Sequence, residues 1–328
     1  MIASFKTNSN ANIFFLFAYA LVLKWHSFLY PQIPVAQPTD GFLYAWLLQF
    51  LSSAGKSAPV MYPFLVLMLT LSQAITFNHL INNKKLLPKP NYLPALAYIL
   101  ITSVFPEWWL FSSVLIINSL MVMVWAMLSS LFNHPRPKAQ VFNAGLIVGV
   151  ASFFYFPAIG FSVLILSALI ILRPFNLSEW LVGILGIVTP YYFLFAFLFL
   201  ADTSNPLTYL PSISVSLPDV QQNIGSLGAI VLLIIPFFIS GFYIQNHMLR
   251  MLIQVRKSWG LMLFYLIITL LIPLVNFAPD FQRWILCAVP LAAFHGYTYF
   301  SAEKKWLPIV LHWLFVALAL SLNIAAGL

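Results

Sequence analysis

Long apolar runs, separated only by short polar or basic segments, dominate this sequence. Of its 328 residues only 7% are charged and 62% are hydrophobic, whereas about a quarter of the residues in a soluble domain are charged. The chain has too few polar side chains to cover its surface in water, so lipid must solvate most of it. The sequence therefore predicts an all-α, polytopic integral membrane protein with a single transmembrane domain over residues 1–328.

The boundaries of the apolar runs define the candidate spans. We expect about eleven transmembrane helices, within a range of nine to twelve. The candidate segments are 12–29, 57–80, 92–105, 110–132, 140–172 (read as two arms), 178–200, 225–246, 259–277, 284–300 and 307–324.

Two stretches, 92–132 and 140–172, are ambiguous, and the positive-inside rule assigns each of them to a hairpin. Basic residues flank both, so each stretch has to cross the membrane an even number of times. The first hairpin has a short arm, Tyr92 to Phe105, that turns at Glu107, and the second turns near Pro157. Arms of about 15 residues reach only about 22 Å, so neighbouring helices must cover their ends. If each stretch were one kinked helix, the count would fall to nine.

The charges sort by side on this topology, with the N-terminus inside and the C-terminus outside. All but three of the fifteen basic residues fall on the inner side, the exceptions being Lys24, Lys56 and Arg283. Five of the seven acidic residues fall on the outer side, and acidic residues took no part in choosing the topology. The outer acids are Asp40, Glu107, Asp202, Asp219 and Asp280, and the inner ones are Glu179 and Glu303.

Two segments form the largest predicted outer loops. Residues 31–56 make the first outer loop, which contains an aromatic-rich stretch from Phe42 to Leu51 that is too short to cross a bilayer. We expect this stretch to be a helix lying in the membrane interface. Residues 201–224 make the second outer loop, which has no basic residue.

Asp40 is the candidate catalytic residue of the first outer loop. A carboxylate at the membrane boundary can act as a general base when it reaches a substrate hydroxyl. Asp40 follows a proline-rich run and precedes the interfacial helix, which could hold it over a crevice. The alternative is structural: PTDG would be an ordinary turn, with Asp40 capping the helix that starts at Phe42.

Glu107 and Arg283 are candidate substrate-binding residues on the same side. Arginine makes bidentate contacts with phosphate, so Arg283 could hold a lipid-linked phosphate. The alternatives for Arg283 are pairing with Asp280 or snorkelling to the headgroups. Glu107 precedes Trp108 and Trp109, which are typical of an aromatic belt, and its alternative is a solvated turn.

Other kinds of site have no signal in the sequence. The six histidines include no HxxH or HExxH pair, so we expect no metal site and no cofactor. No basic block is interleaved with aromatics, so we expect no nucleic-acid partner. The expected partner is membrane lipid, and no protein partner can be named. The single cysteine, Cys287, is interpreted as a small buried hydrophobic residue.

Four parts of the chain resemble the GT-C superfamily of multi-span glycosyltransferases. They are the first span with its acid-bearing outer loop, LPALAYILITSVFPEWW, NAGLIVGVASFFYFPAIGFSVLILSALIILR and RWILCAVPLAAF. The resemblance implies a polyprenyl-phosphate-linked sugar as donor, a catalytic base at Asp40 and a donor-phosphate contact at Arg283. It also implies a GT-C-like arrangement of the helices.

A second resemblance is the closer match overall. FYFPAIGF and RPFNLSEWLVGILGIVTPYYFLF are similar to an uncharacterised family of polytopic inner-membrane proteins from Bacteroidetes. This resemblance implies a multi-pass protein of the bacterial inner (cytoplasmic) membrane.

Together these observations favour a GT-C-like glycosyltransferase, or an inactive relative, at the outer face of the inner membrane. Two alternatives stay open. One is a transporter or flippase subunit, which predicts charged residues deep within the spans. The other is a non-catalytic membrane partner of an envelope assembly.

Overall fold

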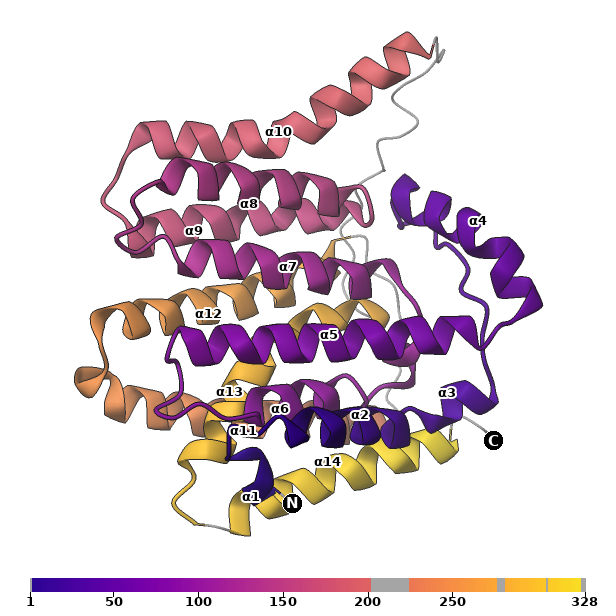
Figure 1. The fold of residues 1–328 in the computed structure, drawn as a ribbon, viewed down its shortest axis with the longest axis vertical. Helices are drawn as coiled ribbons and strands as arrows, with labels where there is room; N and C mark the ends of the chain where they lie inside the picture. Colours follow the sequence, from indigo (N-terminus) through magenta and orange to yellow (C-terminus); the bar gives the residue numbers. More distant parts are fainter. Residues whose placement is uncertain (1, 202–223, 276–280, 305, 326–328) are drawn as a thin grey trace.

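The chain folds into a bundle of roughly antiparallel helices, shown in Figure 1. This computed structural model describes residues 2–201, 224–275, 281–304 and 306–325. The helices are α1 (Ile2–Phe5), α2 (Ala11–Leu23), α3 (Trp25–Leu29), α4 (Phe42–Ser57), α5 (Met61–Asn83), α6 (Leu93–Ile101), η1 (Pro106–Trp109), α7 (Ser113–Ser129), α8 (Pro137–Ser152), η2 (Phe156–Phe161), α9 (Ser162–Leu172), α10 (Leu177–Leu200), α11 (Ile224–His247), η4 (Met248–Arg250), α12 (Ile253–Leu271), η5 (Ile272–Leu274), η6 (Gln282–Cys287), α13 (Ala288–Ser301) and α14 (Trp306–Ala325). The prediction of an all-α fold is confirmed for these described residues.

The connections between the long helices gather at two opposite ends of the bundle. The basic connections 84–92, 130–136, 173–176 and 248–252 lie at the left-hand end in Figure 1. The connection from α3 to α4 and the turns that join α6 to α7 and α8 to α9 lie at the right-hand end. We call these the basic end and the loop end. Among the described residues, the basic connections between the long helices thus lie together at one end of the bundle.

Both ambiguous stretches reverse direction, as the hairpin interpretation predicts. The chain turns at η1 between α6 and α7, and at η2 between α8 and α9. Helix α6 has only nine residues, about 13 Å at 1.5 Å per residue, and all nine are buried. It packs against α5 and against α13, where a Cβ added to Gly296 would lie 2.9 Å from the backbone nitrogen of Pro94. Neighbouring helices therefore cover the short arm on all sides.

Four helices of the described residues are long and apolar enough to cross a membrane. They are Met61–Asn83, Leu177–Leu200, Leu227–Arg250 and Ile253–Leu274. Their outward faces are apolar: on α10, for example, Phe193 is 65% exposed and Phe199 is 84% exposed. Four shorter apolar helices, Ala11–Leu23, Ser113–Ser129, Phe156–Leu172 and Trp306–Leu322, fall within further predicted spans of the described ranges, and eleven crossings stay a prediction.

Glycines allow α8 and α10 to pack at very short range. A Cβ added to Gly145 would lie 2.6 Å from the carbonyl oxygen of Gly183. A Cβ on Gly186 would lie 2.4 Å from the carbonyl oxygen of Phe142. Because real Cβ atoms do not come this close to backbone oxygens, each of these positions requires glycine. The Gly145 and Gly149 pair therefore serves helix packing.

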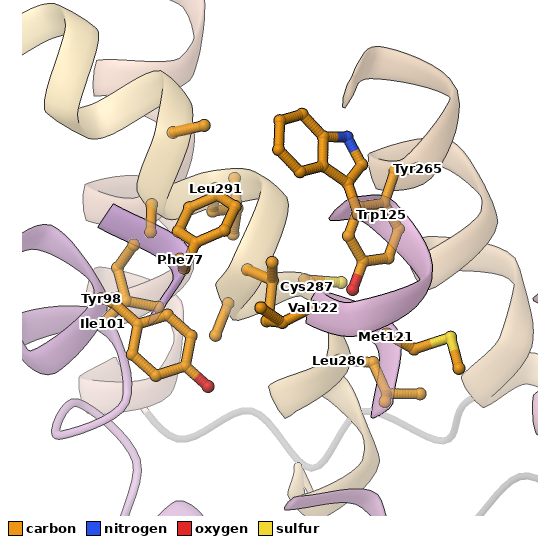
Figure 2. Close-up of a cluster of buried hydrophobic side chains, with 14 of the residues drawn as sticks. Phe77, Tyr98, Ile101, Met121, Val122, Trp125, Tyr265, Leu286, Cys287 and Leu291 are labelled. Atoms are coloured by element: carbon orange, nitrogen blue, oxygen red, sulfur yellow. The ribbon is translucent and has the colours of Figure 1, made fainter. Parts of the chain in front are cut away.

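Aromatic and aliphatic side chains fill the centre of the bundle. Figure 2 shows Phe77 from α5, Tyr98 from α6, Trp125 from α7 and Tyr265 from α12 around the start of α13. Cys287 lies among them and is 4% exposed, which confirms its interpretation as a small buried residue.

Helix α13 donates hydrogen bonds to α11 near a proline that lies inside α11. Pro236 lies inside α11 and has no backbone N–H to donate. His295 Nε2 donates to the carbonyl oxygen of Leu233 at 2.9 Å, and Thr298 Oγ1 donates to that of Pro236 at 2.6 Å. Helix α11 continues through Pro236, and these two hydrogen bonds tie its buried side to α13.

An ion pair between Arg173 and Glu179 lies at the basic end. The Arg173 guanidinium contacts both carboxylate oxygens of Glu179, at 3.0 and 3.2 Å. It also donates to the carbonyl oxygens of Leu131 and His134 at 3.3 and 3.4 Å. One side chain thereby ties the α7–α8 connection to the start of α10. Glu179 is only 3% exposed, so the pair is largely shielded from solvent.

The helix predicted in the first outer loop is present but longer than expected. Helix α4 begins at Phe42 as predicted and continues past Leu51 to Ser57. The aromatic-rich stretch from which the helix was predicted ends at Leu51, before Ser52, Ser53 and Gly55. Gly55 is instead a packing position, where a Cβ would lie 2.2 Å from the Tyr62 hydroxyl. Helix α4 crosses the loop end of the bundle, and Trp46 and Phe50 on it are 62% and 71% exposed.

We predict opposite effects for alanine at two helical glycines. Gly186→Ala should destabilise the protein by about 1–3 kcal/mol, because the new Cβ meets a backbone oxygen that cannot move alone. Gly260→Ala is the matched control: nothing lies within 4 Å of its Cβ, so it should leave stability unchanged or raise it slightly. Thermal unfolding in detergent measures both, and equal midpoints would contradict the packing role.

Candidate functional site

Asp40 closes a turn and also contacts the start of α7. Its Oδ2 accepts the backbone N–H of Gln37 at 2.8 Å, and its own N–H donates to the Gln37 carbonyl oxygen at 2.9 Å. Its Oδ1 accepts the hydroxyl of Ser113 at 2.5 Å. The structure therefore contains the expected turn. Capping of the next helix by Asp40 is wrong, since Gly41 is the N-cap of α4 and no side chain caps it.

Backbone pairing docks the first outer loop onto the α8–α9 turn. The Gly41 N–H donates to the carbonyl oxygen of Phe154 at 2.7 Å, and the Leu43 N–H donates to that of Phe153 at 3.1 Å. Asp40 and Tyr155 form an antiparallel bridge. A Cβ on Gly41 would lie 2.0 Å from the carbonyl oxygen of Phe153, so only glycine permits this approach.

Arg283 joins the same cluster from the far end of the chain. Its Nη2 donates to the Thr39 hydroxyl at 2.5 Å, and its guanidinium lies 5.5 Å from the centre of the Tyr155 ring. The residue is 7% exposed, so it does not snorkel to the surface. Its alternative partner Asp280 lies outside the described residues, as do Asp202, Asp219 and residues 202–223 of the second outer loop. Arg283 thus hydrogen-bonds to Thr39, the residue directly before Asp40.

Tyr44 lies within electrostatic reach of Asp40. The Tyr44 hydroxyl donates to the carbonyl oxygen of Phe111 at 2.7 Å. Burial raises the pKa of the Tyr44 phenol, and the negative charge of Asp40 raises it further. The phenol therefore stays protonated and remains a hydrogen-bond donor across the physiological pH range.

Glu107 lies in a separate cavity beside the cluster of Asp40 and Arg283. The cavity has a volume of about 220 Å³, and neither Asp40 nor Arg283 is among its described lining residues. Glu107 is partly buried rather than fully solvated. The lining residues are His26, Ser27, Tyr30, Gln32, Tyr62, Pro63, Pro106, Glu107, Trp109, Leu110 and Phe111.

Aromatic contacts connect the cavity to the cluster. Trp108 donates its indole N–H to the carbonyl oxygen of Phe281 at 2.7 Å. The rings of Phe105 and Phe281 stack, with centroids 4.8 Å apart. Phe281 precedes Arg283 by two residues, so η1 and η6 hold the cavity and the cluster side by side at the loop end.

His26 is a lining residue that the sequence analysis did not single out. Its Nε2 is buried and has no hydrogen-bond partner among the described residues. Its ring centroid lies 4.8 Å from that of Tyr30 and 6.4 Å from that of Trp109. The available signal was its position, a polar residue directly after the first span. Burial and an unused nitrogen are tertiary properties that no local pattern reveals.

Lys24 is a buried cation next to this region. It is 1% exposed, and its ammonium donates to the carbonyl oxygen of Thr102 at 2.7 Å. Thr102 is the C-cap of α6, where the helix dipole favours positive charge. Among the described residues, no three His, Cys, Asp or Glu side chains lie close enough together to hold a metal ion.

The chemistry available here is that of hydrogen bonding and charge. Asp40 already accepts a hydrogen bond from the Ser113 hydroxyl. A general base makes the same contact with a substrate alcohol. Arg283 holds a neutral hydroxyl, a weaker acceptor than a phosphate oxygen. A substrate could therefore replace Ser113 at Asp40 and Thr39 at Arg283 without leaving a charge unpaired.

We predict that Gly41→Ala loosens the first outer loop. The added Cβ would force the loop away from the carbonyl of Phe153, so the amides of Gly41 and Leu43 would lose their acceptors. Hydrogen exchange over residues 38–45 should become faster by roughly tenfold or more. Gly241→Ala, where no atom lies within 4 Å of the Cβ, is the control. Unchanged exchange in the Gly41 variant would rule out this backbone pairing.

Comparison with known proteins adds no further constraint on this site. No family model matches the chain, and neither the curated proteins nor the solved structures give a match. The likeness to GT-C enzymes and to an inner-membrane family of Bacteroidetes therefore stays a prediction from sequence motifs.

Proposed function

We propose that this chain is a multi-pass protein of the bacterial inner membrane with its loop end facing outward. Four described helices are long and apolar enough to cross a bilayer, and their exposed side chains are apolar. The basic connections lie together at the opposite end, and positively charged loops favour the cytoplasmic side. The exposed aromatic residues Trp46 and Phe50 on α4 suit a helix lying at the membrane interface.

We further propose that the loop end transfers a sugar from a polyprenyl-phosphate donor. The observation that carries this proposal is the contact of Arg283 with Thr39, residues 244 positions apart. It brings a buried guanidinium next to the acid of the first outer loop. A phosphate ligand and a carboxylate base are the two groups that glycosyl transfer from a phosphate-linked donor needs.

The reaction assigns one role to each charged group. Asp40 takes the proton of the acceptor hydroxyl as the oxygen forms a bond to the sugar C1. The bond from C1 to the donor phosphate oxygen breaks, and the phosphate leaves with the electron pair. Arg283 stabilises the charge that develops on the leaving phosphate.

A second candidate function is a non-catalytic partner in an envelope assembly. The specific observation in its favour is that both carboxylate oxygens of Asp40 already accept hydrogen bonds from the protein. Arg283 is likewise engaged and only 7% exposed. In this role the same contacts would simply hold the first outer loop in place.

We predict that two variants of the same hydrogen bond separate these functions. Asp40→Asn should lower sugar transfer in membrane vesicles by about 10²–10⁴-fold, because the amide cannot take the acceptor proton. Ser113→Ala removes the hydroxyl that donates a hydrogen bond to Asp40 but keeps the Asp40 carboxylate, so transfer should persist. If both variants lower the unfolding midpoint equally and transfer follows stability, Asp40 is structural and the partner function is favoured.

The proposed orientation has its own test. Gln37 and Lys89 are both exposed and lie at opposite ends of the bundle. We expect Gln37→Cys to react with an impermeant maleimide in intact spheroplasts, and Lys89→Cys only after the membrane is opened. The buried Cys287 should give little background labelling. Labelling of Lys89→Cys alone in intact spheroplasts would reverse the topology and remove the outer-face site.

A further inference from the structure

Cationic side chains gather on the surface of the basic end. Those in its four connections and in the helix starts that follow them are Lys84, Lys85, Lys89, Arg136, Lys138, Arg173, Arg250, Arg256 and Lys257, and we call them the basic patch. At the loop end, Lys56 is the one exposed cation of the described ranges, because Lys24 and Arg283 are buried. The exposed positive charge of the described chain is therefore concentrated at one end of the bundle.

Carboxylates of the chain offset little of this charge. Glu179 is buried and pairs with Arg173, and this is the one ion pair that the described residues form at the basic end. Glu303, also at this end, is exposed. The remaining cations of the basic patch thus present their charge to a partner outside the described chain.

Exposed apolar side chains lie directly beside the cations. In the connection between α11 and α12, Leu249 is 90% exposed and Leu252 is 68% exposed, on either side of the exposed Arg250. A leucine that enters the acyl boundary next to an arginine at the headgroup level is the arrangement expected at a membrane interface. A soluble acidic partner that paired only with the cations would leave these leucines in water.

Contacts between elements join the connections into one surface. The Lys257 ammonium lies 5.1 Å from the centre of the Phe132 ring, so the start of α12 contacts the connection from α7 to α8. Arg173 donates to the carbonyl oxygens of Leu131 and His134 in the same connection. Three of the four basic connections or their adjoining helices are therefore fixed relative to one another.

We propose that the basic patch binds the phosphate headgroups of anionic phospholipids such as phosphatidylglycerol. Arg250 contacts the phosphate, and Leu249 and Leu252 enter the acyl boundary beside it. Arginine donates several hydrogen bonds to a phosphate group at once. A zwitterionic lipid has the same phosphate, but its own ammonium opposes the charge attraction, so the patch discriminates by net headgroup charge.

This inference rests on the proposed membrane location and not on sugar transfer. If carbonate extracts the chain from membranes, both the location and the lipid contact are wrong. If the chain stays in the membrane but shows no preference for anionic lipid, only the present proposal fails.

A comparison of two lipids tests the proposal. The purified full chain in a nonionic detergent is offered phosphatidylglycerol and phosphatidylcholine with the same acyl chains, and native mass spectrometry measures how much of each stays bound. Phosphatidylglycerol should bind at least about fivefold more tightly, since each cation near the surface is worth about that factor. Its affinity should fall between about 0.1 and about 1 M salt, because the Debye length shortens from about 10 to about 3 Å. Equal binding of the two lipids would overturn the proposal.

Matched variants locate the binding. Arg250→Gln removes one exposed charge of the basic patch and should lower phosphatidylglycerol affinity about fivefold. Lys56→Gln removes an exposed charge at the loop end and should leave that affinity unchanged. If both variants lower it equally, net charge alone attracts the lipid and the basic patch is not a site.

A change at Leu249 distinguishes a lipid from a soluble polyanion. Leu249→Ser keeps every cation but removes an exposed apolar side chain, so phosphatidylglycerol affinity should fall several fold. Binding of heparin, a soluble polyanion used as the probe, should not change in this variant. If Leu249→Ser leaves phosphatidylglycerol affinity unchanged and heparin displaces the lipid, the patch serves a soluble acidic partner and the lipid proposal is refuted.

Discussion

Backbone hydrogen bonds between two irregular segments, residues 40–43 and 153–155, hold the loop end together. Gly41 and Leu43 donate to Phe154 and Phe153, and the approach is so close that it excludes a Cβ at Gly41. Arg283 then contacts both sides of the joint, through the hydroxyl of Thr39 and the ring of Tyr155. Without this joint the acid of the first outer loop would have no fixed position relative to the arginine.

The same requirement, that buried polar groups find partners inside the protein, explains much of the rest of the fold. His295 and Thr298 supply donors beside Pro236 in α11, and Lys24 donates to the end of α6. A chain surrounded by hydrocarbon has no water to do this. Some buried polar atoms of the described residues depart from this pattern, among them His26 Nε2, Trp125 Nε1 and Tyr265 Oη.

Local features of the sequence predicted the helices well and the site contacts poorly. Basic residues around 92–132 and 140–172 indicated two hairpins, and both stretches reverse as predicted. Helix α4 continues to Ser57, past the aromatic-rich stretch that predicted it, and its Gly55 packs against Tyr62. The partners of Asp40 and Arg283 lie 73 and 244 positions away. Such contacts depend on the packing of distant helices, which periodicity and charge bias do not encode.

Helix α6 carries a consequence for how the protein is made. All nine of its residues are buried, and the helix that it packs against most closely on one side, α13, is synthesised nearly 200 residues later. At nine residues it is also too short to be stable alone. A ribosome would therefore deliver α6 long before its final neighbours exist. Its insertion has to wait, sheltered by α5 or by a chaperone of the membrane, until the last third of the chain has been translated.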